Sequence, residues 1–196
     1  MKKLILFIQS VSDPEWEVGE VIQWDIAHNP NYRDSDSRVL YAKNFKVLLN
    51  IIEDVKETVC ESITIQIDAH SNIQGLVFKN KESKKWEEYE DYVPWENINK
   101  SFDTLYKKFG NKILLIFISC YSASFFAVLP SPHVPVIAAE GLVAPRRAEE
   151  QLQVFYDNLC TGNSVEESYN KMTEKFPIEE EIKRMAEQRA ILKFFR

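Results

Sequence analysis

Three short apolar runs, each rich in β-branched residues, constrain the fold of this 196-residue chain more than any other feature. They cover residues 4–8, 63–67 and 113–118, and a fourth run at 134–139 is interrupted by Pro135. Nearly continuous apolar strands of this length are typical of a parallel sheet that is covered on both faces. The runs therefore predict the strands of a buried sheet.

Helical patterns lie between the predicted strands. Residues 95–109 carry apolar side chains three or four apart, begin after Pro94 and stop at Gly110. Similar patterns predict helices over 38–59 and 146–159, and Ser164 with Glu167 forms a capping box that opens another. A last charged helix is expected at about 179–195. This alternation predicts one α/β domain over residues 1–196, a three-layer sandwich whose mostly parallel central sheet is flanked by helices.

Composition excludes several classes of protein. The formal net charge of −6 opposes binding to a nucleic-acid backbone, so no nucleic-acid partner is expected. The apolar part of the opening MKKLILFIQS is too short for a signal peptide and is read as a strand. Residues 113–130 carry no formal charge, but polar residues in the middle and prolines after it argue against a membrane span.

The cysteines indicate a reducing environment. Cys60, Cys120 and Cys160 form no CxxC pair and are too sparse for a disulfide framework, so a cytoplasmic location and free thiols are expected. No His or Cys pair has the spacing of zinc ligands. The sequence therefore predicts no metal site and no cofactor.

Two reactive residues lie at the carboxyl ends of predicted strands, which is where functional groups of doubly wound sheets are usually found. His70 closes the predicted strand ITIQIDAH, and Cys120 closes ILLIFISC. At one sheet edge they can form a thiolate nucleophile and its proton-transfer partner. A helix predicted over 121–128 would lower the pKa of the Cys120 thiol through its dipole. Taken alone, each residue also fits a packing role, to which Cys60 and Cys160 are assigned, while His28 and His133 fall in loops without a partner at a useful spacing.

Further candidates surround this pair. Asp68 lies two residues before His70 on the same strand face, where it either orients the imidazole or, as we prefer, binds a neighbouring loop. Glu140 and Arg146 follow the fourth predicted strand. They either contact a substrate at the same rim or form a solvated turn, and the turn is preferred.

At these residues the sequence resembles the caspase-like cysteine peptidases of clan CD, and within them the bacterial CHAT domains. The resemblance extends from about residue 4 to residue 172. It rests on the strand ending in His70, on SCYSAS around Cys120, and on VPVIAAEGLV followed by QLQVFYDNLCTGNSVEESYNKM. The separation of about 50 residues between the His and the Cys also matches the caspase pattern.

The resemblance implies a catalytic role for two residues and a supporting role for others. Cys120 would be the nucleophile and His70 the general acid and base, with the backbone N–H groups of Cys120 and Ser71 holding the oxyanion. The family usually has Gly where Ser71 stands, and a Cβ there narrows the approach of a scissile carbonyl. Ile118, two residues before the nucleophile, implies a pocket for an uncharged residue, with Asp68 and Glu140 as further pocket candidates.

Two functions of different classes follow. The first is a cysteine endopeptidase that cleaves a protein partner in a bacterial defence or cell-death pathway, with a separate protein as activator or sensor. The second is a caspase-like protein-binding module that has lost catalytic activity, which is favoured by the presence of Ser71 where the family usually has Gly. A nucleotide-binding α/β domain is a weaker third, because the five glycines are scattered and form no phosphate-binding loop.

Overall fold

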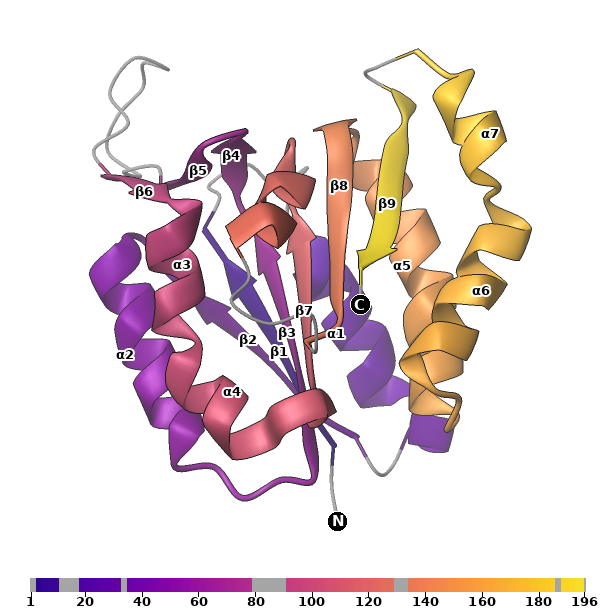
Figure 1. Cartoon of the computed structure of the whole chain (residues 1–196). Coiled ribbons are helices and arrows are strands. Elements are labelled where there is room, and N and C mark those ends of the chain that lie inside the picture. Colours follow the sequence, from indigo (N-terminus) through magenta and orange to yellow (C-terminus); the bar gives the residue numbers. More distant parts are fainter. Residues whose placement is uncertain are drawn as a thin grey trace.

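A six-stranded sheet forms the centre of the protein in a computed structural model that describes residues 3–10, 18–32, 35–78, 91–128, 134–185 and 188–195 (Figure 1). Its strands are β1 (Lys3–Gln9), β2 (Ser35–Tyr41), β3 (Ser62–Asp68), β7 (Ile113–Ile118), β8 (Val136–Val143) and β9 (Ala190–Phe195). The α-helices are α1 (Val18–His28), α2 (Phe45–Lys56), α3 (Trp95–Ser101), α4 (Asp103–Phe109), α5 (Pro145–Cys160), α6 (Val165–Lys175) and α7 (Ile178–Ile182). Short 3-10 helices are η2 (Pro30–Tyr32), η3 (Gly110–Lys112) and η4 (Ser122–Val128).

The central sheet has the order β2-β1-β3-β7-β8-β9. The first five strands run parallel, and β9 pairs antiparallel with β8. The three apolar runs form β1, β3 and β7, which confirms the predicted α/β class. The chain moves from β1 to one neighbour, β2, and later to the other, β3, so the order reverses beside β1. Such a reversal leaves a crevice at the carboxyl ends of the strands, where ligands bind in open α/β sheets.

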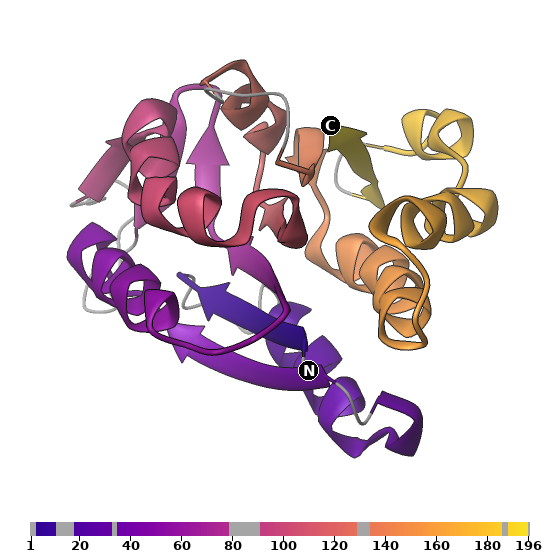
Figure 2. The ribbon, with the colours of Figure 1, turned by 60° about the horizontal axis from the view of Figure 1, so that its bottom comes forward.

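Two apolar layers cover the sheet, and the alternation of side chains along β1 separates them. Leu4, Leu6 and Ile8 face the layer formed by α2, α3 and α4. Ile5 and Phe7 face the opposite layer, which includes α1 and α5. Figure 2 shows α2 to α4 together on one side of the sheet. This is the arrangement expected for a parallel sheet in a three-layer sandwich.

A second, three-stranded sheet stands above the carboxyl edge of the main sheet (Figure 1). Its strands are β4 (His70–Asn72), β5 (Gly75–Phe78) and β6 (Asp91–Pro94). Asn72 closes the β4–β5 turn, because its side-chain oxygen accepts from the N–H groups of Gln74 and Gly75 at 2.8 and 3.2 Å. Gly75 is required by space, since a Cβ there would lie 2.1 Å from the carbonyl oxygen of Val93.

The helix predicted over 38–59 is only partly correct. Residues up to Tyr41 form β2, which pairs with β1 and keeps it from being a sheet edge. The helix begins later, at Phe45, because the Asn44 side chain accepts from the N–H of Val47 at 2.9 Å and so caps it. Two other local predictions are confirmed: the Ser164–Glu167 capping box, and Gly110, which ends α4 with φ of +56°.

The C-terminal helix predicted at about 179–195 is wrong. In the described part of that stretch the α-helix ends at Ile182, and residues 190–195 form β9, with Leu192 buried and Ile182 left exposed. The reason is tertiary: β8 would otherwise present unpaired backbone groups at the sheet edge, and β9 satisfies them. Residues 79–90 lie outside the described part of the chain.

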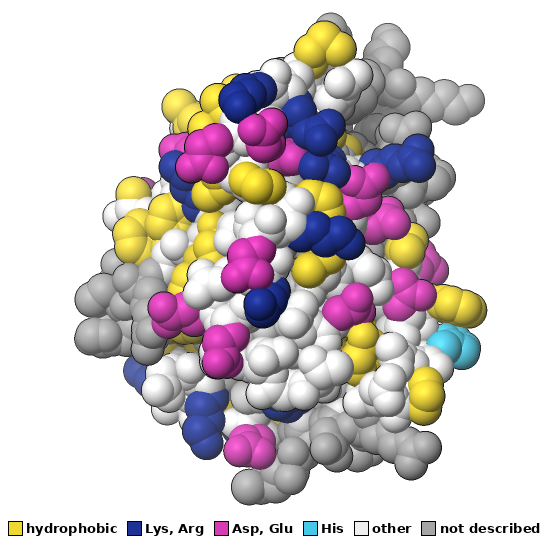
Figure 3. Space-filling model, turned by 90° about the vertical axis from the view of Figure 1, so that its right-hand side faces the viewer, with side chains coloured by type: hydrophobic (Ala, Val, Ile, Leu, Met, Phe, Trp, Pro, Cys, Tyr) yellow, Lys and Arg dark blue, Asp and Glu magenta, His cyan; other side chains and the backbone are white. Residues whose placement is uncertain are grey.

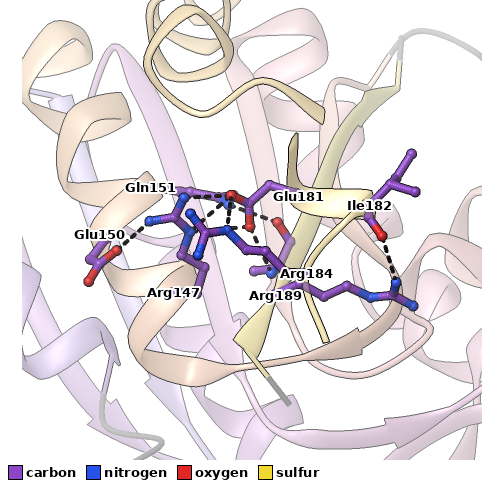
Figure 4. Close-up of polar contacts among 8 residues, drawn as sticks. Arg147, Glu150, Gln151, Glu181, Ile182, Arg184 and Arg189 are labelled. Carbon is purple, nitrogen blue, oxygen red and sulfur yellow. Dashed lines mark hydrogen bonds and ion pairs between the residues drawn. The ribbon is translucent and has the colours of Figure 1, made fainter. Parts of the chain in front are cut away.

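A buried ion pair fastens α7 and β9 to α5 (Figure 4). The Arg147 guanidinium of α5 donates to the Glu181 carboxylate at 2.5 and 3.0 Å, and Glu181 is 1% exposed. Arg184 also donates to Glu181, which accepts weakly from the N–H of Ala190 at 3.4 Å. Burial raises the pKa of Glu181, but the hydrogen bonds and positive charge of Arg147, together with the Ala190 N–H and the charge of Arg184, outweigh it and hold that pKa below its usual range.

The face around α6 and α7 carries acidic and basic side chains side by side (Figure 3). Exposed pairs include Lys171 with Glu174 and Lys183 with Glu180, at 3.1 and 2.8 Å. Charges of both signs at such spacing largely cancel beyond a Debye length. In the described part of the chain, no helix is long and apolar enough to cross a membrane.

Candidate active site

His70 and Cys120 leave adjacent parallel strands at the same edge of the main sheet. In the β3–β7 register Asp68 pairs with Ile118, and the N–H of Ala69 extends the pairing by donating to the Ile118 carbonyl at 3.3 Å. His70 and Cys120 each lie two residues beyond that pair. The Ser71 hydroxyl donates a hydrogen bond to the Cys120 carbonyl, so the segments holding the two candidates are in direct contact.

The Cys120 thiol is half-buried and packs against the core layer that contains α1 and α5. Burial raises its pKa above the ordinary value, and hydrogen bonding to the backbone N–H of Val143 opposes that rise without cancelling it. The expected α-helix after Cys120 is instead η4, a 3-10 helix of seven residues. The structure therefore differs from the expected low thiol pKa, and a proton acceptor is needed to form the thiolate.

A bulge in β8 places two backbone groups against the Cys120 loop. Between Ala139 and Val143 the register with β9 shifts, and Gly141 inside this stretch has φ of +94°. The Gly141 carbonyl accepts from the N–H of Tyr121 at 2.7 Å. Tyr121 itself has φ of +58°, in the left-handed region that is uncommon for residues other than Gly. Bulges often re-aim groups beside functional sites, and this one is aimed at the candidate nucleophile.

Ser71 sits in the β4–β5 hairpin with its backbone N–H turned away from β5. The pair Asn72–Gly75 closes a two-residue turn, so the next pair, Ser71–Leu76, is the one that exchanges no ladder hydrogen bonds. Because β4 is an edge strand of the small sheet, that N–H points out of the sheet. The Ser71 N–H therefore takes no part in the β4–β5 ladder.

Asp68 and Ile118 do not line an open pocket. Both are fully buried. The Asp68 carboxylate accepts from the N–H of Gly19 at 2.7 Å and from the side-chain amide of Gln66 at 2.8 Å. Burial raises the pKa of Asp68 to about 7, against these two hydrogen bonds that lower it. The carboxylate therefore binds the first turn of α1 and a side chain of its own strand, and not a loop as expected.

The same contact bears on the nucleotide-binding alternative. Gly19 lies in the first turn of α1, and a Cβ there would lie 2.8 Å from Phe7 and 2.9 Å from Asp68, so the helix end is packed closely on the sheet. In nucleotide-binding α/β folds this helix end holds phosphate through its free N–H groups. Here the protein's own carboxylate takes that place.

Glu140 is the one pocket candidate with an exposed side chain. It lies in the β8 bulge and forms an ion pair with Lys193 of β9 at 2.5 Å. Arg146, in the first turn of α5, is exposed as well. The hydroxyl of Ser71 and the backbone groups of Gly141 and Val143 were not anticipated. A glycine inside an apolar strand pattern is a recognised signal for a bulge, and Gly141 carries it.

The other cysteines and histidines that the structure describes are Cys60, Cys160 and His28. Cys60 and Cys160 are half-buried free thiols, and burial raises the pKa of both. His28 is exposed on α1 and stacks on Trp24 at 4.4 Å, while His133 lies outside the described residues. Among the residues with described positions, no group of three or more His, Cys, Asp or Glu side chains is arranged to hold a metal ion.

Two solved cysteine proteases share this architecture. The Drosophila initiator caspase Dronc matches with a TM-score of 0.64 at 14% identity, over 98% of this chain and 77% of that one. A secreted C11 cysteine protease from Bacteroides thetaiotaomicron, solved with an irreversible peptide inhibitor, matches with a TM-score of 0.61 at 10% identity, over 90% of this chain. The chain spans 59% of that protease's length.

The fold is caspase-like. At these identities the likeness establishes the fold alone, which agrees with the clan predicted from the motifs. No family model matches the sequence, and a comparison with curated proteins finds no match. The assignment of roles to His70, Ser71 and Cys120 therefore rests on their placement in this structure and on the sequence motifs.

Proposed function

We propose that the chain is a cysteine endopeptidase that uses Cys120 as nucleophile and His70 as general base and acid. The observation that carries the proposal is the contact between the Ser71 hydroxyl and the Cys120 carbonyl. It holds the segment that begins with His70 against the candidate nucleophile, at the carboxyl edge of a caspase-like sheet.

The proposed reaction has two steps. The Cys120 sulfur attacks the scissile carbonyl carbon while the thiol proton moves to His70, and the N–H groups of Ser71 and Cys120 hold the oxyanion. The C–N bond then breaks, and His70 gives the proton to the leaving amine. Water, deprotonated by His70, attacks the thioester and releases the carboxylic acid and the free thiol.

The environment of Cys120 determines at which stage of the reaction its thiol loses the proton. Because burial raises the thiol pKa, the thiol is mainly protonated near neutral pH. Proton transfer to His70 therefore accompanies attack, instead of preceding it as a stable ion pair. The Val143 N–H supplies local stabilisation for the sulfur as its negative charge develops.

The finer assignments follow the resemblance to CHAT domains. We propose a protein substrate, and a separate activating or sensor protein in a bacterial defence or cell-death pathway. A cytoplasmic location is proposed from the three free thiols. Glu140, exposed in the β8 bulge, is the pocket candidate that remains.

One alternative has support of its own. A protein-binding module on this fold would need no reactive thiol, and both the raised thiol pKa and the side chain at Ser71 agree with that role. Architecture is common to the two functions, so only the chemistry of Cys120 separates them.

Acylation by p-nitrophenyl acetate tests the proposal without knowledge of the substrate. The Cys120 sulfur takes the acetyl group, and one equivalent of p-nitrophenolate is released in a burst. We expect the burst to vanish in Cys120→Ala and to slow roughly 100-fold in His70→Ala, since general base catalysis contributes about that much. Cys160→Ala is the matched control, because Cys160 is another half-buried thiol.

A peptide mixture analysed by mass spectrometry then separates acylation from proteolysis. We expect new peptide termini with the unsubstituted chain and none with Cys120→Ala. A missing burst, or a burst that His70→Ala leaves unchanged, would contradict the endopeptidase and favour the binding module.

A further inference from the structure

The peptide group between Cys120 and Tyr121 is held from both sides by different parts of the fold. Its carbonyl oxygen accepts from the hydroxyl of Ser71, which comes from β4 of the small sheet. Its N–H donates to the Gly141 carbonyl at 2.7 Å, and Gly141 comes from the β8 bulge of the main sheet. Both polar atoms of this one peptide are thus fixed by long-range contacts.

These two contacts sustain a backbone conformation that Tyr121 would not adopt alone. Its φ of +58° lies in the left-handed region, which costs on the order of 1–2 kcal/mol for a residue with a Cβ. Strained residues of this kind persist only where the surroundings determine them. Removing the Ser71 hydroxyl leaves the Cys120 carbonyl without this donor, so the peptide is free to rotate toward an unstrained conformation.

Movement of this peptide matters because it is joined directly to Cys120, which supplies the sulfur and, through its own N–H in the preceding peptide, one proposed oxyanion donor. The other proposed donor is the backbone N–H of Ser71, which points out of the small sheet. A single residue therefore provides one donor directly and braces the residue that provides the other.

We propose that the Ser71 hydroxyl is a positioning group that aligns the two halves of the oxyanion hole. The inference rests on the endopeptidase function proposed above and extends it to a side chain that the family motif does not require. The family usually has Gly at this position, and here the Ser71 hydroxyl supports the site because it donates to the Cys120 carbonyl.

Two reagents with different demands on the site test this inference. Acylation by p-nitrophenyl acetate passes through a tetrahedral oxyanion, and the C–O bond to p-nitrophenolate breaks as the thioester forms. Iodoacetamide alkylates the same sulfur by direct displacement of iodide and forms no oxyanion. The ratio of the two rate constants at Cys120 therefore reports the oxyanion hole separately from thiol reactivity.

We expect the acylation-to-alkylation ratio to fall about tenfold or more in Ser71→Ala and in Ser71→Gly, since a lost oxyanion donor costs 100-fold or more and a misplaced one somewhat less. Ser71→Thr keeps the hydroxyl and is expected to stay within about threefold of the unsubstituted chain on the same scale. Ser62→Ala, the same change in a half-buried strand position at the opposite end of β3, is the control.

The outcomes separate the two levels of the proposal. A Cys120-dependent burst whose ratio is unchanged in Ser71→Ala, or not restored by Ser71→Thr, overturns the positioning role and leaves the endopeptidase standing. A higher ratio in Ser71→Gly also overturns it, since that result means the side chain obstructs the site. Absence of any Cys120-dependent burst in the unsubstituted chain overturns both.

Discussion

Replacing Glu181 with Gln tests how the C-terminal strand is held in the sheet. Glu181→Gln keeps the shape of the side chain and removes its charge. The buried carboxylate accepts from Arg147 at 2.5 and 3.0 Å and from Arg184 at 3.2 Å (Figure 4). The substitution leaves the Arg147 guanidinium, whose side chain is only 16% exposed, without its buried counter-charge.

The expected loss follows from the burial of both partners. Removing one partner of a buried ion pair costs about 3–5 kcal/mol. Arg147 keeps a second carboxylate, that of Glu150 at 2.6 Å, so we expect about 2–3 kcal/mol. An unfolding entropy of about 2.1 cal/mol/K per residue, applied to 196 residues, converts this into a melting temperature about 5–7 °C lower.

Urea titrations followed by circular dichroism between pH 3.5 and 8 provide the assay. The pKa of Glu181 is lowered by folding, so its stabilising contribution is complete above the unfolded pKa and is lost as the pH falls through the folded pKa. The difference between the unsubstituted chain and Glu181→Gln should therefore shrink only in the acid range. Glu174→Gln, in an exposed pair with Lys171, is the control and should change stability by less than about 0.5 kcal/mol.

Two results would refute this reasoning. One is a Glu181→Gln chain as stable at pH 7 as Glu174→Gln, which would mean that the buried pair only offsets its own desolvation. The other is a stability difference that is independent of pH down to 3.5, since the charge of Glu181 would then not be its cause.

Two further predictions concern the carboxyl edge of the sheet. Burial raises the pKa of Asp68 to about 7, so the stability that its protonated form contributes is complete below about pH 4 and is lost as the pH rises through 7. Urea titrations should show the free energy of unfolding falling by on the order of 2 kcal/mol between pH 5.5 and 8.5, and Asp68→Asn should not show this loss. The same pH dependence of stability in the two chains would contradict the prediction. Gly75→Ala places a Cβ 2.1 Å from the Val93 carbonyl oxygen, so it should lower the free energy of unfolding by about 3 kcal/mol and expose the β4–β5 hairpin to proteolysis. Gly110→Ala has open space around it and should lower that free energy by only about 1 kcal/mol. Equal losses of stability in the two variants would show that the contact with β6 is not the constraint.

Local patterns in the amino-acid sequence are enough to predict several elements of the fold. Apolar runs specify β1, β3 and β7 because a strand buried on both faces removes nearly every side chain from water, and two polar exceptions in β3, Gln66 and Asp68, bond to each other. The caps at Ser164 and Gly110 are set by hydrogen bonds or backbone angles within a few residues. The placement of His70 and Cys120 at one edge follows from the same logic, since parallel neighbours end on the same side.

Other features depend on partners that are distant in the sequence and follow only from the folded chain. Residues 190–195 become β9 because β8 needs a neighbour, and the burial of Asp68 follows from the docking of α1 on it. The contact between Ser71 and Cys120 joins residues that are 49 positions apart, and the bulge at Gly141 joins a third segment to them. No local pattern encodes such contacts, because they arise only when separate strands end at a common edge.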